Sequence, residues 1–157
     1  MEEGLLVRKI REGTVIDHIP AGRALDVLKI LGLSGQEGIT IAVVMNVPSK
    51  KLGRKDIVKV EAKFLEPKEV DEISLIAPTA TINIVRDFKV IEKRRVQVPG
   101  EVVGLLKCPN PNCVTNSKRE PVATRFKPVS LKPLKLKCYY CEETISEDQI
   151  LGQLLKE

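Results

Sequence analysis

The fold of the last third of the chain is decided by Cys108-Pro-Asn-Pro-Asn-Cys113 together with Cys138-Tyr-Tyr-Cys141. These four cysteines are the only ones in the sequence, and 24 residues separate the two pairs. Each short spacing lets two thiols project from one tight turn, and two such turns can face each other across a metal ion. The pattern therefore predicts one structural zinc per chain, with four thiolates that leave no position open for water or substrate.

Two disulfides are the other interpretation of four cysteines. The chain opens with Met1-Glu-Glu-Gly4, which has none of the basic start, apolar core or cleavage site of a secretion signal. Paired cysteines in a reducing compartment more often bind metal than oxidise. The longest apolar stretch, 39–47, is too short to cross a bilayer. We therefore expect a cytoplasmic protein with no membrane contact.

Length and composition indicate two small domains with aliphatic cores. The chain has 157 residues, of which 43% are hydrophobic but only 3% aromatic, so Ile, Val and Leu must fill the interior. A boundary is visible at Val98-Pro99-Gly100. We expect an N-terminal domain over 1–97 and a zinc-binding domain over 101–157, which is small enough to need a metal. The net charge of +5 is a weak indication of anionic partners.

The first domain alternates strand and helix patterns. Pattern and punctuation predict these elements: strand 6–19, helix 23–33, strand 39–47, polar loop 48–55, strand 57–64, a helix opened by Pro67 and ended by Pro78, and a long last strand 80–93. The order β-α-β-β-α-β is the ferredoxin-like pattern of the α+β class, an antiparallel sheet with both helices on one face.

Strand parity then predicts which side chains share the helix-free face of that sheet. If the apolar positions Val58, Val60, Ala62 and Phe64 and the pair Ile82 and Ile84 face the helices, the residues between them face away. The set expected to gather on the open face or at its end is Asp17, His18, Lys59 and Asn83.

Each of these residues also has an ordinary structural interpretation. A strand lysine is most often solvated, and Asn83 could satisfy backbone groups at a strand end. His18, the single histidine, could be a hydrogen-bonded residue with no ligand, and Asp17 could cap the following helix. Periodicity alone does not decide between these interpretations and a binding site.

The second domain is expected to be a small zinc-ribbon-like β domain. Strands are predicted over 102–107, 122–129 and 134–137, and Ser146 with Gln149 forms a capping box before a short helix. Asn110 and Asn112 lie between the first two cysteines, where asparagine suits the turn itself.

Several blocks of the sequence resemble the regulatory chains of aspartate carbamoyltransferase. The blocks, which follow in the family's order and cover nearly the whole chain, are G-T-V-I-D-H-I-P (13–20), N-x-P-S (46–49), G-R-K-D-x-x-K (53–59), A-P-x-A-T-x-N (77–83), C-P-N-x-N-C and C-x-Y-C-E. The resemblance implies a non-catalytic subunit that binds CTP and ATP, pairs with a second copy as a homodimer, and docks its zinc domain on catalytic chains of pyrimidine synthesis.

The resemblance also implies roles for matching residues. Lys59 and Lys93 would hold effector phosphates, as cationic donors should. Asp17 and His18 would lie beside the base and sugar, Asn83 would complete the pocket, and Lys55 is a less certain contributor. The remaining residues implied for the pocket are Val7, Ile10, Ile57, Phe88 and Val90. Asn110, Asn112 and Glu142 would face the catalytic chain.

Three positions depart from the family pattern, and two other functions compete with it. Phe88 stands where a tyrosine is usual, and Arg8 and Lys9 add positive charge beside the base pocket. A nucleic-acid-binding zinc ribbon would instead use the lysines and tyrosines of the second domain and would bind with steep salt dependence. A stand-alone enzyme based on Asp17 and His18 lacks a nucleophile and an open metal site. We therefore expect neither enzyme activity nor a nucleic-acid partner.

Overall fold

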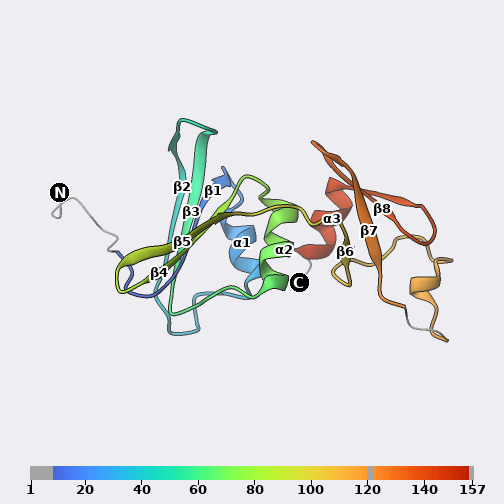
Figure 1. Cartoon of the computed structure of the whole chain (residues 1–157), viewed down its shortest axis with the longest axis horizontal. Helices are drawn as coiled ribbons and strands as arrows, with labels where there is room; N and C mark the ends of the chain where they lie inside the picture. The colour runs from blue at the N-terminus through green and yellow to red at the C-terminus, as the bar shows by residue number, and fades with distance from the viewer. Residues whose placement is uncertain (1–8, 120–121, 156–157) are drawn as a thin grey trace. The chain divides into compact units, whose positions relative to one another are not determined.

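The computed structural model of the chain describes residues 9–119 and 122–155. The chain divides into two compact units, Met1–Val96 and Gln97–Glu157. The first unit contains β1 (Gly13–Pro20), α1 (Ala24–Ile30), β2 (Ile41–Ser49), β3 (Gly53–Glu61), α2 (Pro67–Ile76), β4 (Thr81–Arg86) and β5 (Lys89–Arg95) (Figure 1).

The sheet of the first unit has the ferredoxin-like order predicted from the sequence, with one strand added. Its order is β2-β3-β1-β4-β5, and every neighbouring pair is antiparallel. Strands β1 to β4 form the expected four-stranded core, and β5 extends it beside β4. Both helices cover one face (Figure 1), and α1 contacts α2, β2 and β3. The α+β class and the antiparallel sheet are therefore confirmed.

An aliphatic layer between the sheet and the helices holds this unit together. Residues with no exposed surface form it: Ile16, Ile19, Ala24, Val27, Val58, Val60, Ile73 and Ala77. Burial of each valine or isoleucine among them contributes about 1.5–3 kcal/mol relative to exposure. The unit therefore has an apolar core that needs no ligand.

The prediction of one long strand over 80–93 was wrong. The chain turns at Asp87 and Phe88, which both have left-handed backbone angles (φ 52° and 66°), so β4 and β5 form a tight hairpin. No glycine marks this turn, which is why the sequence pattern missed it. The hairpin brings Lys93 back to lie opposite Asn83.

The end of β3 also differs from the prediction. The strand begins at Gly53, inside the expected polar loop, and ends at Glu61. Ala62, with a positive φ of 64°, is exposed, and Phe64 is 36% exposed beneath the Arg86 guanidinium, so neither belongs to the buried layer that strand parity predicted for them. Pairing in β1 starts only at Gly13, where the backbone of Val60 comes so close that a Cβ atom would lie 2.1 Å from its carbonyl oxygen.

The second unit is a small β domain. It contains β6 (Val102–Val103), the 3-10 turn η2 (Val114–Asn116), β7 (Arg125–Leu131), β8 (Leu134–Cys138), β9 (Thr144–Ser146) and α3 (Glu147–Leu154). The sheet order is β6-β7-β8-β9, all antiparallel. Its buried apolar residues are few: Val102, Leu106, Phe126, Leu134, Leu136, Ile145 and Ile150. The predicted capping box is confirmed, since the Ser146 hydroxyl accepts from the Gln149 amide at 3.3 Å.

Candidate functional sites

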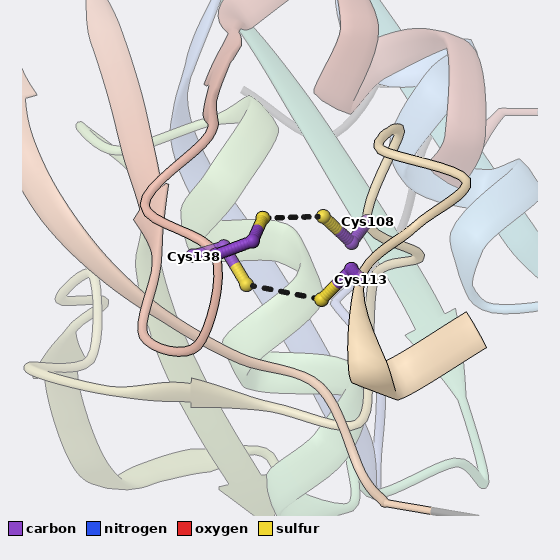
Figure 2. Close-up of side chains that lie close together, drawn as sticks. Cys108, Cys113 and Cys138 are labelled. Atoms are coloured by element: carbon purple, nitrogen blue, oxygen red, sulfur yellow. Dashed lines mark hydrogen bonds between the residues drawn. The ribbon is translucent and has the colours of Figure 1, made fainter. Parts of the chain in front are cut away.

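The four cysteines of the second unit converge on one point. Their sulfur atoms all lie within 4.8 Å of one another. Cys108 and Cys113 come from the loop before η2, while Cys138 ends β8 and Cys141 follows it. The Cys108–Cys141 sulfurs are 3.5 Å apart and the Cys113–Cys138 sulfurs 3.8 Å, and Figure 2 shows the two loops facing each other across the cluster.

These distances fit a metal ion better than disulfides. A disulfide needs a sulfur separation of about 2.05 Å, and all four cysteines are free thiols. In a tetrahedral zinc–thiolate site with bonds of about 2.3 Å, neighbouring sulfurs lie roughly 3.8 Å apart. The four cysteines therefore form a donor set that could hold a metal ion.

The first loop is shaped by asparagine side chains. The Cys113 amide donates to the Asn110 carbonyl at 3.0 Å, and the Asn112 amide donates to Asn110 Oδ1 at 3.0 Å. Asn116 Nδ2 donates to the carbonyls of Cys108 and Asn110 at 3.0 and 2.7 Å. The turn chemistry considered for Asn110 is thus present, and Asn116 is a structural residue that the sequence pattern did not indicate.

The second loop closes on the strand that carries it. The Cys138 amide donates to the Glu143 carbonyl at 2.8 Å, and the Glu142 amide donates to the Cys138 carbonyl at 3.1 Å. Glu142 adopts a left-handed φ of 66°, which lets the chain reverse over four residues. Strand β8 and this tight reversal together aim two thiols at the first loop.

Burial and hydrogen bonds act in opposite directions on the thiols. Burial raises the pKa of Cys108 and of Cys138. At Cys113 burial also opposes ionisation, but hydrogen bonds from the Thr115 hydroxyl and amide outweigh it and lower the pKa to about 7. Amide and hydroxyl donors of this kind stabilise thiolates, which are the form that binds metal.

The helix-free face of the first sheet carries a row of four residues across four strands, three of them polar. Lys59 of β3 pairs with Val15 of β1, Val15 pairs with Asn83 of β4, and Asn83 pairs with Lys93 of β5. Directly opposed residues in antiparallel strands point to the same side. Their sequence neighbours Ile16, Val58 and Ile82 are buried in the layer beneath the helices. The row therefore lies on the open face and places a lysine on each side of an amide.

A second row lies beside the first and adds a residue that the sequence reasoning missed. Asp17 pairs with Thr81, and Thr81 pairs with Arg95. Arg95 thereby joins Lys59 and Lys93 on the open face. Among the described residues, none of these three cations has a carboxylate within ion-pair distance. Only the β4–β5 turn places Arg95 here, so strand parity along the expected single strand could not find it.

The polar end of this face is shaped by a bulge in β1. The register of β1 on β3 shifts between Ile16 and Ile19, and His18 in the bulge has a φ of 55°. The His18 amide donates to Asp17 Oδ1 at 2.6 Å, and its Nδ1 lies 3.1 Å from the Thr81 hydroxyl. Bulges of this kind redirect side chains next to binding sites.

Burial and nearby charges shift the pKa values of the two titratable groups at the bulge, Asp17 and His18. Burial alone would raise the pKa of Asp17, but the Lys55 ammonium at 2.9 Å and the His18 amide hold it below its ordinary value. Burial lowers the pKa of His18, the positive fields of Lys55, Lys51 and Lys93 lower it further, and only Asp17 opposes them. The imidazole is thus neutral at pH 7 in a region of positive potential.

The apolar residues expected in the pocket do not all lie in the same environment. Ile57 shares the face of Lys59 by strand parity, and Val90 pairs with Val85 on the same face. Ile10 is buried, whereas Phe88 lies in the turn and is 55% exposed. Val7 and Arg8 lie outside the described residues.

The residues expected to face a partner surround the cysteine cluster. Asn112 and Glu142 are exposed, and the Glu142 carboxylate pairs with Lys137 at 3.1 Å. A hollow of about 560 Å³ lies beside the first loop, lined by Lys107, Cys108, Pro109, Pro111, Asn116 and Gln153. The Lys107 amide donates to Gln153 Oε1 at 2.6 Å and Gln153 Nε2 donates to the Lys107 carbonyl at 2.7 Å, which fastens α3 to the segment entering the cluster; this segment is not a strand, since β6 ends at Val103 and not at 107 as predicted.

Two of the cations near the cysteine cluster, Arg125 and Lys137, are already paired with carboxylates. Arg125 is held by Glu101 at 2.8 Å and lies over the Tyr139 ring, and Lys137 is paired with Glu142. Charges that are already neutralised contribute little to phosphate binding. In the described part of the chain, no helix has the length and hydropathy needed to span a membrane.

Comparison with known proteins gives one consistent result. Residues 5–97 match the family model described as aspartate carbamoyltransferase regulatory chain, allosteric domain. Residues 100–151 match the model described as aspartate carbamoyltransferase regulatory chain, metal binding domain.

Individual relatives carry the same description over their full lengths. A regulatory chain of aspartate carbamoyltransferase from Thermofilum pendens is 77% identical over 155 residues, which cover 99% of this chain and 98% of that one. The corresponding chain from Hyperthermus butylicus is 64% identical over 96% and 94% of the two chains. That from Korarchaeum cryptofilum is 60% identical over 98% of each.

Proposed function

The chain belongs to the family of aspartate carbamoyltransferase regulatory chains, and from this premise we propose that the open face of its first sheet binds nucleoside triphosphates such as CTP and ATP. A regulatory chain is the non-catalytic subunit of its enzyme and has catalytic chains as partners. The binding of effectors, and the control that they exert on catalysis in pyrimidine synthesis, are what the proposal adds.

The observation that carries the proposal is the row Lys59–Val15–Asn83–Lys93. Two lysines, joined in the next row by Arg95, meet the charge of a triphosphate, and charge-assisted hydrogen bonds to phosphate oxygens contribute about 1.5–3 kcal/mol each. Neutral His18, Thr81 and Asn83 offer the directional bonds that a base and a ribose need. Apolar Ile57 and Val90 can pack against the flat surface of the base.

The second unit is proposed to bind zinc and to dock on catalytic chains. Four thiolates are a donor set typical of structural zinc, and their separations suit its bond length. Asn110, Asn112 and Glu142 lie in the two loops that the metal would hold together, and Asn110 and Asn112 are chain neighbours of Pro109 and Pro111, which line the hollow beside Cys108. Pairing with a second copy of the chain is proposed from the family resemblance alone.

Titration of CTP, ATP and UTP against the full-length chain and its Lys59→Ala variant tests the nucleotide site. We expect binding at least about tenfold weaker in the variant, because tenfold corresponds to about 1.4 kcal/mol and one charged contact exceeds that. Lys63→Ala is the matched control, since Lys63 lies four residues along the chain and is paired with Glu69 on α2 at 3.3 Å. Equal affinity in Lys59→Ala and the parent chain places the phosphates elsewhere.

A further inference from the structure

Asp56 is a buried carboxylate with no part in the nucleotide row. It has no exposed surface, yet its two oxygens accept three backbone hydrogen bonds. Oδ1 accepts from the Asn46 amide at 2.8 Å, and Oδ2 accepts from the amides of Gly22 and Ala24 at 2.8 and 3.0 Å. A buried charge is tolerated only when such partners surround it.

The three donors belong to segments that frame the open face. Asn46 lies in the bulge of β2, where the register on β3 shifts between Val44 and Val47 and φ is 61°. Gly22 and Ala24 lie where the chain leaves β1, just after its own bulge at His18, and enters α1. Both bulges lie opposite β3 around Asp56, so the Asp56 side chain ties the two irregular segments to β3, which lies between β2 and β1.

Asp56 also follows directly on Lys55, whose side chain points the opposite way. Successive residues of a strand alternate between faces. Lys55 reaches Asp17 at 2.9 Å on the open face, while Asp56 bonds α1 and the β2 bulge. The position of the Lys55–Asp17 pair therefore depends on a segment of β3 that Asp56 anchors from behind.

We propose that Asp56 is a positioning residue for the nucleotide site: it fixes the bulges of β1 and β2 and thereby the placement of Asp17, His18 and Lys55 before the ligand arrives. The inference rests on the proposed nucleotide function and assigns Asp56 no contact with the ligand. A preformed site binds more tightly because less ordering remains to be done on binding.

The sign of the effect separates positioning from electrostatics. Removal of a negative charge near a site for an anion strengthens binding if charge alone matters. Asp56→Asn removes the charge. It also breaks at least one hydrogen bond, because the new NH₂ group cannot accept and must face at least one backbone N–H whichever way the amide turns. Positioning therefore predicts weaker binding, and electrostatics predicts tighter binding.

The experiment measures CTP binding to the full-length, zinc-loaded chain by calorimetry, at a temperature where circular dichroism shows both proteins folded. Asp56→Asn should bind CTP at least fivefold more weakly than the parent chain. The NMR signals of the His18 ring, the single histidine, should also move in the ligand-free variant, whereas a role in stability alone leaves these folded-state signals in place. Asp26→Asn is the control, because it removes the same charge from the carboxylate on α1 that pairs with Arg23.

A second variant covers the case in which Asp56→Asn does not fold. Gly22→Ala keeps every charge and meets no neighbour within 4 Å, but its φ of 94° disfavours alanine and shifts the donor away from Oδ2. It should weaken CTP binding at least twofold. Equal or tighter binding by a folded Asp56→Asn, or by Gly22→Ala if that is the only one that folds, overturns the inference. Absence of CTP binding by the parent chain refutes the nucleotide function itself, and the inference with it.

Discussion

The two compact units of the chain are held together by different forces. In the first unit, a sheet and two helices enclose a continuous aliphatic layer that includes Ile16, Val58 and Ile73, all fully buried. In the second, a short sheet encloses few apolar residues. The two cysteine loops instead bring four sulfur atoms within 4.8 Å of one another. The contrast separates a unit built on an apolar core from a unit whose cysteines form a donor set that could hold a metal ion.

This difference suits the two units to different roles. A sheet with one face already covered can leave its other face open for a ligand without losing its core. If a metal holds the second unit together, as proposed, it also fixes the positions of the exposed residues Asn112 and Glu142. Loss of metal should therefore affect docking far more than nucleotide binding.

The largest expected effect is that of metal removal on the second unit. Structural zinc contributes about 10–16 kcal/mol to the folding of small domains at neutral pH. Stripping the metal with a mercurial, or replacing Cys138 with serine, should unfold the second unit and release the chain from catalytic chains. The measurements are zinc content, size-exclusion chromatography with catalytic chains, and amide NMR spectra.

The comparison between the units predicts a selective result. Amide signals of the sheet over 13–95 should persist in the metal-free chain, while those of the second unit collapse. A metal-free chain that keeps both sets of signals and stays bound to catalytic chains would show that the cysteines are not what holds the second unit together.

A smaller effect is expected from a cavity in the first unit. Ile16→Ala removes a fully buried side chain between Val58 and Ile82, and such truncations cost about 3 kcal/mol. Denaturant unfolding should show the first unit destabilised by that amount, with zinc content unchanged. Leu25→Ala is the control, because Leu25 on α1 is 61% exposed and should change stability by less than about 0.5 kcal/mol.

The smallest expected effect concerns the protonation of His18. Its pKa is lowered by burial and by nearby lysines, so the folded state favours the neutral ring. The corresponding stability is present above the ordinary value of 6.5 and is lost as the pH falls through the lowered folded pKa. A bound triphosphate adds negative charge, which raises the pKa of His18, and by linkage CTP binds more tightly as the pH falls through this range.

NMR titration of the His18 ring with and without CTP measures both parts of this prediction. The ligand-free chain should titrate below 6.5, and saturating CTP should move the midpoint upward. A midpoint that does not respond to CTP would place the phosphates away from the β1 bulge and would separate His18 from the nucleotide site.

Much of the architecture followed from local sequence signals. The cysteine spacing predicted a shared cluster, because two tight turns each present two thiols whatever the rest of the domain does. The capping box at Ser146 and the helix opened by Pro67 were confirmed, since their chemistry involves only near neighbours in the chain. Alternating apolar residues predicted burial correctly at Val58, Val60 and Ile82, and wrongly at Ala62 and Phe64, which lie beyond the end of β3.

The arrangement of residues on the open face was harder to predict from the sequence. The turn at Asp87 and Phe88 has no glycine, so its left-handed angles follow from the pairing of β5 with β4 and not from residue preference. This turn alone moves Lys93 and Arg95 onto the row of Asn83 and Thr81. Asp56 stood out only as part of the block G-R-K-D-x-x-K, and its bonds could not be predicted because its three donors are separated from it by 10 to 34 positions along the chain.

The linear sequence was enough to predict most of the helices and strands, the buried positions around Val58 and Ile82, and the gathering of four thiols in the second unit. Each of these depends on periodicity or on spacings of a few residues, which a linear chain displays directly. The cations beside Asn83, the positions of the bulges and the hydrogen bonds of Asp56 became visible only in the folded chain. These features depend on the register between strands distant in sequence, and register is set by the packing of the whole sheet.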